Sequence, residues 1–356
     1  MTLTTYPIDP LLDLAAHRGQ RVATFTWQLV DGITDGVLGD LHPIRDFPPT
    51  VTHDTSQAIK RSIQSIQFGT ADTAAINPIT DRIRPYMLIG GVSWPLGRFM
   101  FTNDSNAEST GGAQANDVLV DEMFIVDQQT DTGFAAAGST VNSAVTNLLT
   151  GLPIPLPALV EPSPFPGVGA WSAGTRRSQI LDELANQGDY FTPWMDNLGR
   201  FRMIRTFDPA SAVPQFDWDA GNKVLAEPKP LRTSDILQAP NRFVVISNSA
   251  NAAAGPIVGT YDVPPSAPHS IAARGFVIPA VFDLQLSDPS QAAAAAQGIG
   301  IRQTIFERFE LSTAPDPRHD SYDVIHWQGA NWLELAWSIT CVEGAPMRHV
   351  IRRSYV

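Results

Sequence analysis

The chain has 356 residues, a length that suits two or three domains. Its 26 glycines and 29 prolines favour turns and short strands, which excludes a coiled coil or a helical bundle, while a hydrophobic content of 43% is enough to bury cores. The formal net charge of −12 argues against a non-specific nucleic-acid binder. The chain shows neither an apolar run long enough to cross a membrane nor the N-terminal pattern of a signal peptide.

Residues 21–135 read as a series of strands. In residues 21–30 the side chains alternate, with Phe25, Trp27 and Leu29 on one face. The next pair of strands is expected at 82–88 and 96–102, joined through Gly90-Gly91 and Trp94-Pro95, because glycine adopts the positive φ of a hairpin turn without strain. Residues 103–116 are polar and glycine-rich and predict a loop. Residues 117–126 predict a further strand.

The middle of the chain predicts two helices and a hairpin. An apolar stripe from Val141 to Leu149 indicates an amphipathic helix, with Ser139 as its N-cap and Gly151 at its end. Six prolines in residues 152–168 favour an extended segment. A second helix is expected at 176–187, ended by Gly188, and a hairpin with the turn 196–199 follows it.

The last third of the chain again predicts mostly strands. Residues 242–247 form a short apolar strand, and alternation around Phe309 and Leu311 indicates a half-buried one. Between them Asp288-Pro289-Ser290-Gln291 begins a helix, with Asp at the N-cap and Pro at the first helical position, and Gly298 and Gly300 weaken that helix. Two closing strands are expected at 327–342 and 347–356.

Motifs for catalysis are scarce. The chain contains no phosphate-binding P-loop, no dinucleotide fingerprint, no HExxH and no G-x-S-x-G. Residues 169–174 (GAWSAG) come nearest to the last motif, but they are one residue out of register and lie in a Pro/Gly segment. The single cysteine, Cys341, excludes an internal disulfide and cysteine-based zinc sites, and its apolar neighbours predict a buried, inert thiol.

Two groups of histidines and aspartates contain possible metal ligands. The first group is His42, Asp46, His53 and Asp54, in a turn-rich stretch without a spacing that holds the side chains on one face, so surface residues are the preferred interpretation. The second group, His319, Asp320 and His326, lies in what reads as a turn between strands. We therefore predict neither a metal site nor a general base in either group.

Paired carboxylates and tryptophans are the residues that would indicate glycan hydrolysis or binding. The paired carboxylates of glycoside hydrolysis would have to come from Asp121 and Glu122, or from Asp217, Asp219 and Glu227. Neighbouring residues on a strand point to opposite faces, which argues against the first pair. Five tryptophans fall inside strand patterns, where core or interface packing is the preferred interpretation: Trp27, Trp94, Trp194, Trp332 and Trp337.

Three stretches, in this order and spacing, carry a resemblance to a known family. They are 81–85 with 94–99; 178–209, a short helix and a hairpin with an acidic turn before Gly199-Arg200; and 288–296 followed by 309–311 and 316–318. Together they resemble the tail-tip baseplate hub proteins of long-tailed bacteriophages, often called minor tail proteins in phages of actinobacteria. Where relatives usually have a Gly-Asp pair before the next strand, this chain has Ser321-Tyr322-Asp323.

The resemblance implies a structural virion protein at the distal end of a siphovirus tail. It implies a homotrimeric ring in which each subunit contributes two tube-like barrels, so that three chains continue the sixfold tail tube. The implied partners are further copies of the chain, the distal tail protein, the tape measure protein and a central fibre or other tip protein. Genomic DNA would pass through the lumen without specific binding, and an acidic chain suits such a channel because like charges repel.

The expected fold class is therefore β-rich α+β, with two tube-like β-barrel hub domains and a small α/β insertion. The expected ranges are 1–135 for the first barrel, with 210–250 as a candidate completion, 136–209 for the insertion and 251–356 for the second barrel-like domain. We expect no enzymatic activity and no catalytic, cofactor-binding or metal-ligating residues. The alternatives are another tail-tip component, such as a distal tail or receptor-binding protein, and a tail-associated peptidoglycan or glycan hydrolase.

Overall fold

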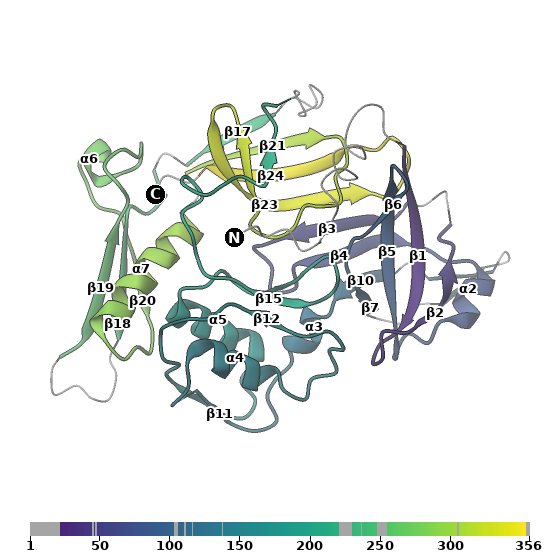
Figure 1. Cartoon of the computed structure of the whole chain (residues 1–356), viewed down its shortest axis with the longest axis horizontal. Helices are drawn as coiled ribbons and strands as arrows, with labels where there is room; N and C mark the ends of the chain where they lie inside the picture. The colour runs from purple at the N-terminus through teal and green to yellow at the C-terminus, as the bar shows by residue number, and fades with distance from the viewer. Residues whose placement is uncertain are drawn as a thin grey trace.

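The computed structural model describes residues 22–44, 46, 48–102, 106–109, 112–115, 117–136, 138–220, 230–235, 237–247, 255–304 and 306–353. One large β-sheet dominates this part of the chain (Figure 1). It runs across the top and the right-hand side of the view, and most of the helices lie below it and to its left.

The N-terminal part contributes eight strands to the large sheet. They are β1 (Ala23–Asp31), β2 (Val37–Leu41), β3 (Thr50–Asp54), β4 (Arg61–Ile66), β5 (Asp81–Ile89), β6 (Val92–Pro95), β7 (Phe99–Phe101) and β10 (Asp117–Asp121). The predicted alternation in the first strand is confirmed, because Trp27 and Leu29 are buried while Thr24 and Thr26 face outward. The apolar faces of these strands form one core together with side chains of two strands from the C-terminal part of the chain.

Strands from the C-terminal part complete the same sheet. They are β16 (Phe216–Asp217), β17 (Leu231–Ser234), β21 (Glu307–Thr313), β22 (Val324–Trp327), β23 (Ala330–Thr340) and β24 (Met347–Arg353). β23 pairs with β3, so that Trp337 lies opposite His53 and Ile339 opposite Val51. The first and last parts of the chain are therefore joined by backbone hydrogen bonds into one sheet.

The strand order is β17-β21-β24-β23-β3-β4-β10-β7-β5-β1-β2, with β22 and β16 attached beside β23, and β6 beside β5. The expected β-rich fold with few helices is confirmed. Within this large sheet all described strand pairs are antiparallel except β16 and β22. Among the described strands β17 and β2 end this order without pairing to each other. Within the segment 210–250, β16 pairs with β22 and β17 with β21, so both strands join this sheet through its C-terminal strands.

The predicted helix–hairpin unit is present below the sheet. It contains α3 (Met123–Val126), α4 (Val141–Leu149), α5 (Arg177–Gly188) and the short strands β11 (Phe134–Ala135), β12 (Leu159–Val160), β13 (Ala170–Trp171), β14 (Trp194–Met195) and β15 (Phe201–Met203). The apolar faces of α4 and α5 meet in a separate core. α5 includes Gly188 as its last residue, and its C-cap is Asp189, with a left-handed φ of 58°, rather than the expected Gly188.

A second small unit stands at the left of Figure 1. Its three strands, β18 (Arg242–Ser247), β19 (Ile257–Asp262) and β20 (Pro279–Asp283), are covered by α7 (Pro289–Gln303), and α6 (Ile271–Arg274) lies at one end. The predicted cap of α7 is confirmed, since the Asp288 side chain accepts a hydrogen bond from the Gln291 amide at 2.9 Å. Only the part of residues 251–356 from β21 onward belongs to the large sheet.

Other elements differ from the sequence predictions. α7 continues through Gly298 and Gly300, which were expected to weaken it. A side chain at these two positions would clash with Asp189 and Tyr261, so the glycines allow the helix to pack closely against them. The hairpin after β5 is β5–β6, with Gly90 and Gly91 both at positive φ in its turn. In the expected loop 103–116, the described residues form a small hairpin of β8 (Asn106–Ser109) and β9 (Gly112–Ala115). The strand expected at 117–126 ends at Asp121, where α3 follows.

One helix, α2 (Thr70–Ala75), precedes β5 and had no counterpart in the sequence prediction. Within the described residues no helix has both the length and the apolar character needed to cross a membrane. All five tryptophans expected to pack inside strands are buried, as predicted.

Candidate functional site

The first group of histidines and aspartates does not form a metal site. His53 lies on β3 and is buried, so the expectation of a surface residue is wrong for it. Its Nε2 lies 2.8 Å from Ser321 Oγ, its ring stacks on Trp337, and burial holds its pKa well below the usual value. His42 and Asp46 are exposed as expected, and the Asp54 carboxylate accepts the Ser56 amide in a turn.

The acidic pair after β10 is structural. Asp121 accepts the backbone amides of Arg61 and Met123, both at 3.0 Å, while Glu122 contacts the guanidinium groups of Arg82 and Arg98. The two carboxylates therefore have different partners, as the alternation of a strand predicts. Burial raises the pKa of Asp121 to about 7 and also raises the pKa of Glu122.

The other candidates are also occupied by local contacts. Asp219 accepts the amides of Gln328 and Gly329, at 2.8 and 2.9 Å, and closes the turn between β22 and β23. Glu227 lies outside the described residues. In the GAWSAG stretch, Trp171 Nε1 donates to Glu183 at 2.8 Å, which ties the stretch to α5. Cys341 is half-buried against the core of the large sheet rather than fully buried as expected, and burial raises the pKa of its thiol to about 12.

Lys60 had no role in the sequence analysis, although the structure buries it beside a cavity of about 230 Å³. Burial lowers its pKa to about 8, a shift that is also seen in nucleophilic lysines. Its three amine hydrogens have three acceptors, however: the carbonyls of Thr55 and Gln57 and the hydroxyl of Thr192. This arrangement holds the turn between β3 and β4 against the helix–hairpin unit.

A buried polar junction centres on Arg61, in β4. Its guanidinium contacts the Asp320 carboxylate at 2.5 Å, the Leu96 carbonyl at 3.2 Å and the Asn197 side chain. The junction thus joins the first group of strands, the turn 196–199 and the loop between β21 and β22. The Arg61 guanidinium also lies 5.3 Å from the centre of the Trp337 ring, a cation–π contact that connects β23 to the junction.

The partners of Arg61 are themselves held in place. Trp194 Nε1 donates to Asp320 at 3.0 Å, and the Asn197 amide donates to the carbonyls of Pro317 and His319, both at 3.2 Å. The stretch 178–209 therefore meets Pro317, which belongs to the stretch 316–318, and the neighbouring residues His319 and Asp320. The stretch 94–99 contributes the carbonyl of Leu96.

Tyr322 occupies a backbone conformation that suits glycine. Its φ is 65°, in the left-handed region that favours glycine. The side chain is buried and stacks on Phe191 with ring centroids 4.3 Å apart, and its hydroxyl contacts Thr192. This packing between the loop and the helix–hairpin unit offsets the strain of a non-glycine residue.

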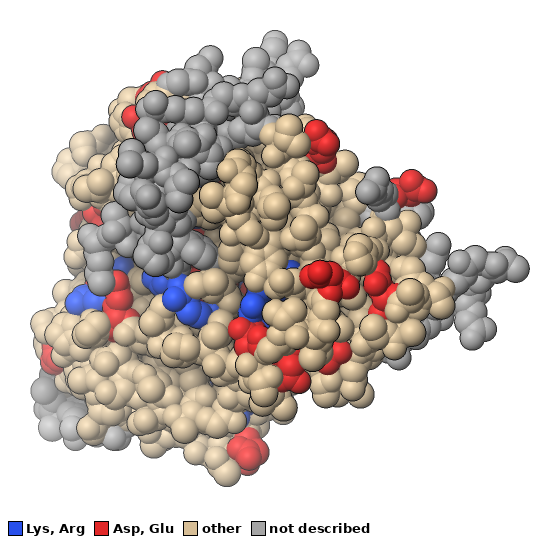
Figure 2. Space-filling view, turned by 45° about the vertical axis from the view of Figure 1, so that its right-hand side comes forward, with Lys and Arg blue, Asp and Glu red and all other residues tan. Residues whose placement is uncertain are grey.

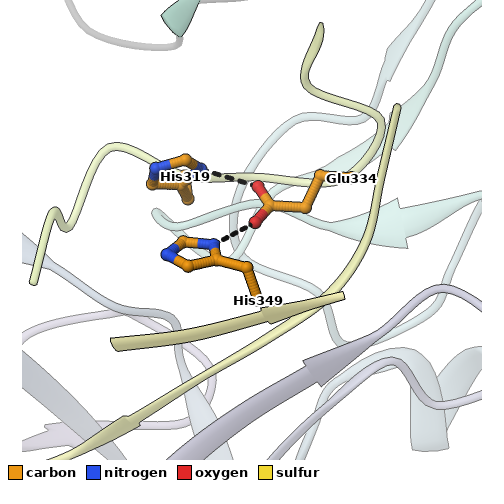
Figure 3. Close-up of side chains that lie close together, drawn as sticks. All are labelled: His319, Glu334 and His349. Carbon is orange, nitrogen blue, oxygen red and sulfur yellow. Dashed lines mark hydrogen bonds and ion pairs between the residues drawn. The ribbon is translucent and has the colours of Figure 1, made fainter. Parts of the chain in front are cut away.

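Sequence analysis missed one cluster of titratable residues, which joins His319, Glu334 and His349 (Figure 3). Each histidine places Nδ1 2.6 Å from a different oxygen of the Glu334 carboxylate. All three side chains are buried. Burial raises the pKa of Glu334 and lowers that of His349, and the hydrogen bonds between them oppose both shifts.

A β-bulge brings Glu334 into this cluster. Trp337 lies opposite His349 across β23 and β24, but the register shifts between Ala336 and Glu334, so that Glu334 lies opposite Ile351. Side chains of directly opposite residues share a face, and His349 and Ile351 are two apart on β24. Without the extra residue Leu335, Glu334 would point to the other face. Strand periodicity alone cannot reveal this.

On the face shown in Figure 2, uncharged side chains cover most of the described surface, and many of the charged groups lie in a band across the middle, with basic and acidic groups close together. Further ionic clusters lie in the interior, at Arg61, Arg98 and Glu334. The interior clusters stabilise the packing between segments of the chain.

No family model and no curated protein matches the chain. Solved structures match its fold over nearly its whole length. The 43 kDa tail protein of prophage MuSo2 from Shewanella oneidensis has a TM-score of 0.57 at 13% identity, covering 92% of this chain and 98% of that one. The tail protein from Neisseria meningitidis MC58 has 0.57 at 14%, covering 93% and 97%. Prophage tail protein gp18 from Listeria monocytogenes EGD-e has 0.59 at 7%, covering 93% and 95%. The chain therefore has the fold of these tail proteins.

Proposed function

We propose that this chain is a structural protein of a bacteriophage tail and acts as the baseplate hub at the tail tip. The observation that carries the proposal is the alignment with three tail proteins, two of them from prophages, over more than nine tenths of each chain. The same architecture is thus shared in full, not through one common module. The buried junction at Arg61 supports the proposal, because it explains why stretches that resemble hub proteins keep their order and spacing.

In the proposed assembly three copies form a ring at the distal end of a siphovirus tail, of the type found in actinobacteriophages. Each copy contributes two tube-like β-barrel domains, so the ring adapts the sixfold tail tube to a threefold tip. Its neighbours are the distal tail protein, the tape measure protein and a central fibre or other tip protein. The net charge of −12 suits a lumen through which DNA passes, because like charges repel.

Immunogold electron microscopy on particles from the same genome tests the location. Gold at the far end of the tail is the expected result, and a threefold reconstruction of that end would then locate the chain. Gold on the capsid or along the tail shaft would overturn the hub assignment. Light scattering of the purified chain at high concentration tests the ring, for which we expect three times the mass of one chain.

We further propose that the chain has no enzymatic activity. This rests on the acidic candidates, because Asp121, Glu122 and Asp219 are each occupied by backbone amides or guanidinium groups. A cell-wall zymogram with the purified chain should show no clearing. Clearing would instead favour the tail-associated hydrolase.

A further inference from the structure

We propose that His319, Glu334 and His349 form a buried binding site for a divalent transition-metal ion of the zinc class. The two Nδ1 atoms and the carboxylate oxygens all lie within 4.8 Å of one another. Two imidazoles and one carboxylate are three of the four ligands that zinc takes in proteins, and imidazole favours zinc, cobalt, nickel or copper over magnesium or calcium. The inference does not depend on the proposed function.

Thr313 holds His349 from the side away from Glu334. The Thr313 hydroxyl lies 2.8 Å from His349 Nε2 and 2.9 Å from the Ala314 carbonyl. The ring is thereby oriented with Nδ1 facing the Glu334 oxygen at 2.6 Å. His319 Nδ1 faces the other oxygen of the same carboxylate, also at 2.6 Å. In the metal-free chain protons occupy these two contacts, and a bound metal ion would take their place.

The surrounding charges favour the metal ion. Four buried carboxylates lie close together here, because the charges of Asp316, Asp320 and Glu334 all act on Asp323. Asp320 is paired with Arg61, and Asp316 with Arg318. Among the described residues no arginine or lysine lies within ion-pair distance of Glu334 or Asp323. Buried negative charge is costly unless it is paired, and a divalent ion would pair with the charge of Glu334.

The ligands are also held in position from outside. His319 stacks on Phe216, with centroids 3.8 Å apart and planes 10° apart, and the edge of Trp218 meets His349. The Thr313 hydroxyl contacts the outer nitrogen of His349, as hydrogen-bonding groups outside the ligand set do for metal-ligating histidines. Binding of the metal would displace the protons from both Nδ1 atoms, which lose them to solvent.

Metal analysis of the whole chain tests the proposal. The protein is stripped with a chelator, loaded with Zn²⁺, dialysed and measured by inductively coupled plasma mass spectrometry, with about one zinc per chain expected. Loading with Co²⁺ should give the visible absorption band of a tetrahedral nitrogen- and oxygen-liganded ion. Glu334→Gln and His349→Ala should abolish both signals, whereas His42→Ala, which removes an exposed histidine, should leave them unchanged.

Thr313→Val provides a variant that keeps all three ligands. It removes the hydroxyl that holds His349 Nε2, so we expect zinc affinity to fall about tenfold or more. The proposal is overturned if the wild-type chain keeps no zinc and gives no Co²⁺ band, in which case protons close the network. It is also overturned if a folded Glu334→Gln chain keeps as much zinc as the wild type.

Discussion

The guanidinium of Arg61 contacts the carboxylate of Asp320 at 2.5 Å, although 259 residues separate them in the chain. Both side chains are almost completely buried. Charges in such a position are favourable only when geometry and further hydrogen bonds compensate for lost hydration. Arg61 and Asp320 meet this condition through Leu96, Asn197 and Trp194.

Replacing Arg61 with methionine should destabilise the protein strongly. Asp320 would then be left buried without its cation, a change that costs about 3–5 kcal/mol in the free energy of unfolding. Urea unfolding followed by tryptophan fluorescence measures this, because Trp194 and Trp337 lie beside the junction. Arg242→Met is the matched control. It breaks the exposed pair with Asp262, which solvent screens, so its loss of stability should be far smaller than that of Arg61→Met. Equal losses for the two variants would contradict a special role of the junction.

Elements whose signals are local were predictable from the sequence. The alternation in β1, the apolar faces of α4 and α5 and the cap at Asp288 depend on residues a few positions apart, and the structure confirms them. The hairpin of β8 and β9 was missed because its residues are polar and lack strand alternation.

The interior polar clusters could not be predicted in this way. His53 reads as a turn residue, and it is buried only because β3 pairs with β23 from the other end of the chain. Glu334 joins His319 and His349 through a β-bulge, which strand periodicity does not anticipate. These features depend on long-range pairing, so no local pattern encodes them.

Gly259→Ala should separate β19 from α7. A Cβ atom at this position would lie 2.2 Å from the backbone carbon and oxygen of Ala292, which cannot rotate away as a side chain could. We expect a loss of about 1–3 kcal/mol, the usual cost of overpacking, despite the entropic advantage of alanine. Gly39→Ala serves as the control, because a Cβ there meets nothing within 4 Å. Thermal melts of the two variants measure the difference, and an unchanged midpoint for Gly259→Ala would show that the helix can shift.

The single thiol offers a direct check of burial. Burial raises the pKa of the half-buried Cys341 to about 12, so the thiol is protonated at pH 8 and lacks the thiolate that reacts. Ellman's reagent should therefore leave the native chain unmodified and label one thiol per chain in urea. Rapid labelling of the native chain would mean that the sheet edge around Cys341 opens.

Stability should depend on pH through Asp121. Burial raises its pKa from 3.8 to about 7, so between these values the native state holds a proton that the unfolded state has lost. The contribution of Asp121 to the free energy of unfolding is therefore fully present below pH 4 and is lost as the pH rises towards 7. Asp121→Asn stays neutral throughout. The advantage of the wild type over this variant should shrink between pH 4.5 and 7.5, by a few kcal/mol, since one pKa unit corresponds to about 1.4 kcal/mol.

The control for this pH dependence is Asp219→Asn. The amides of Gly329 and Gln328 lower the pKa of Asp219 below 3.8, so its carboxylate is ionised in both native and unfolded states above pH 4.5. The difference in unfolding free energy between the wild type and Asp219→Asn should thus stay constant from pH 4.5 to 7.5. Urea titrations at both pH values measure the two differences. If the curves for Asp121→Asn and the wild type also ran parallel, Asp121 would be ionised in the native state, held by the amides of Arg61 and Met123.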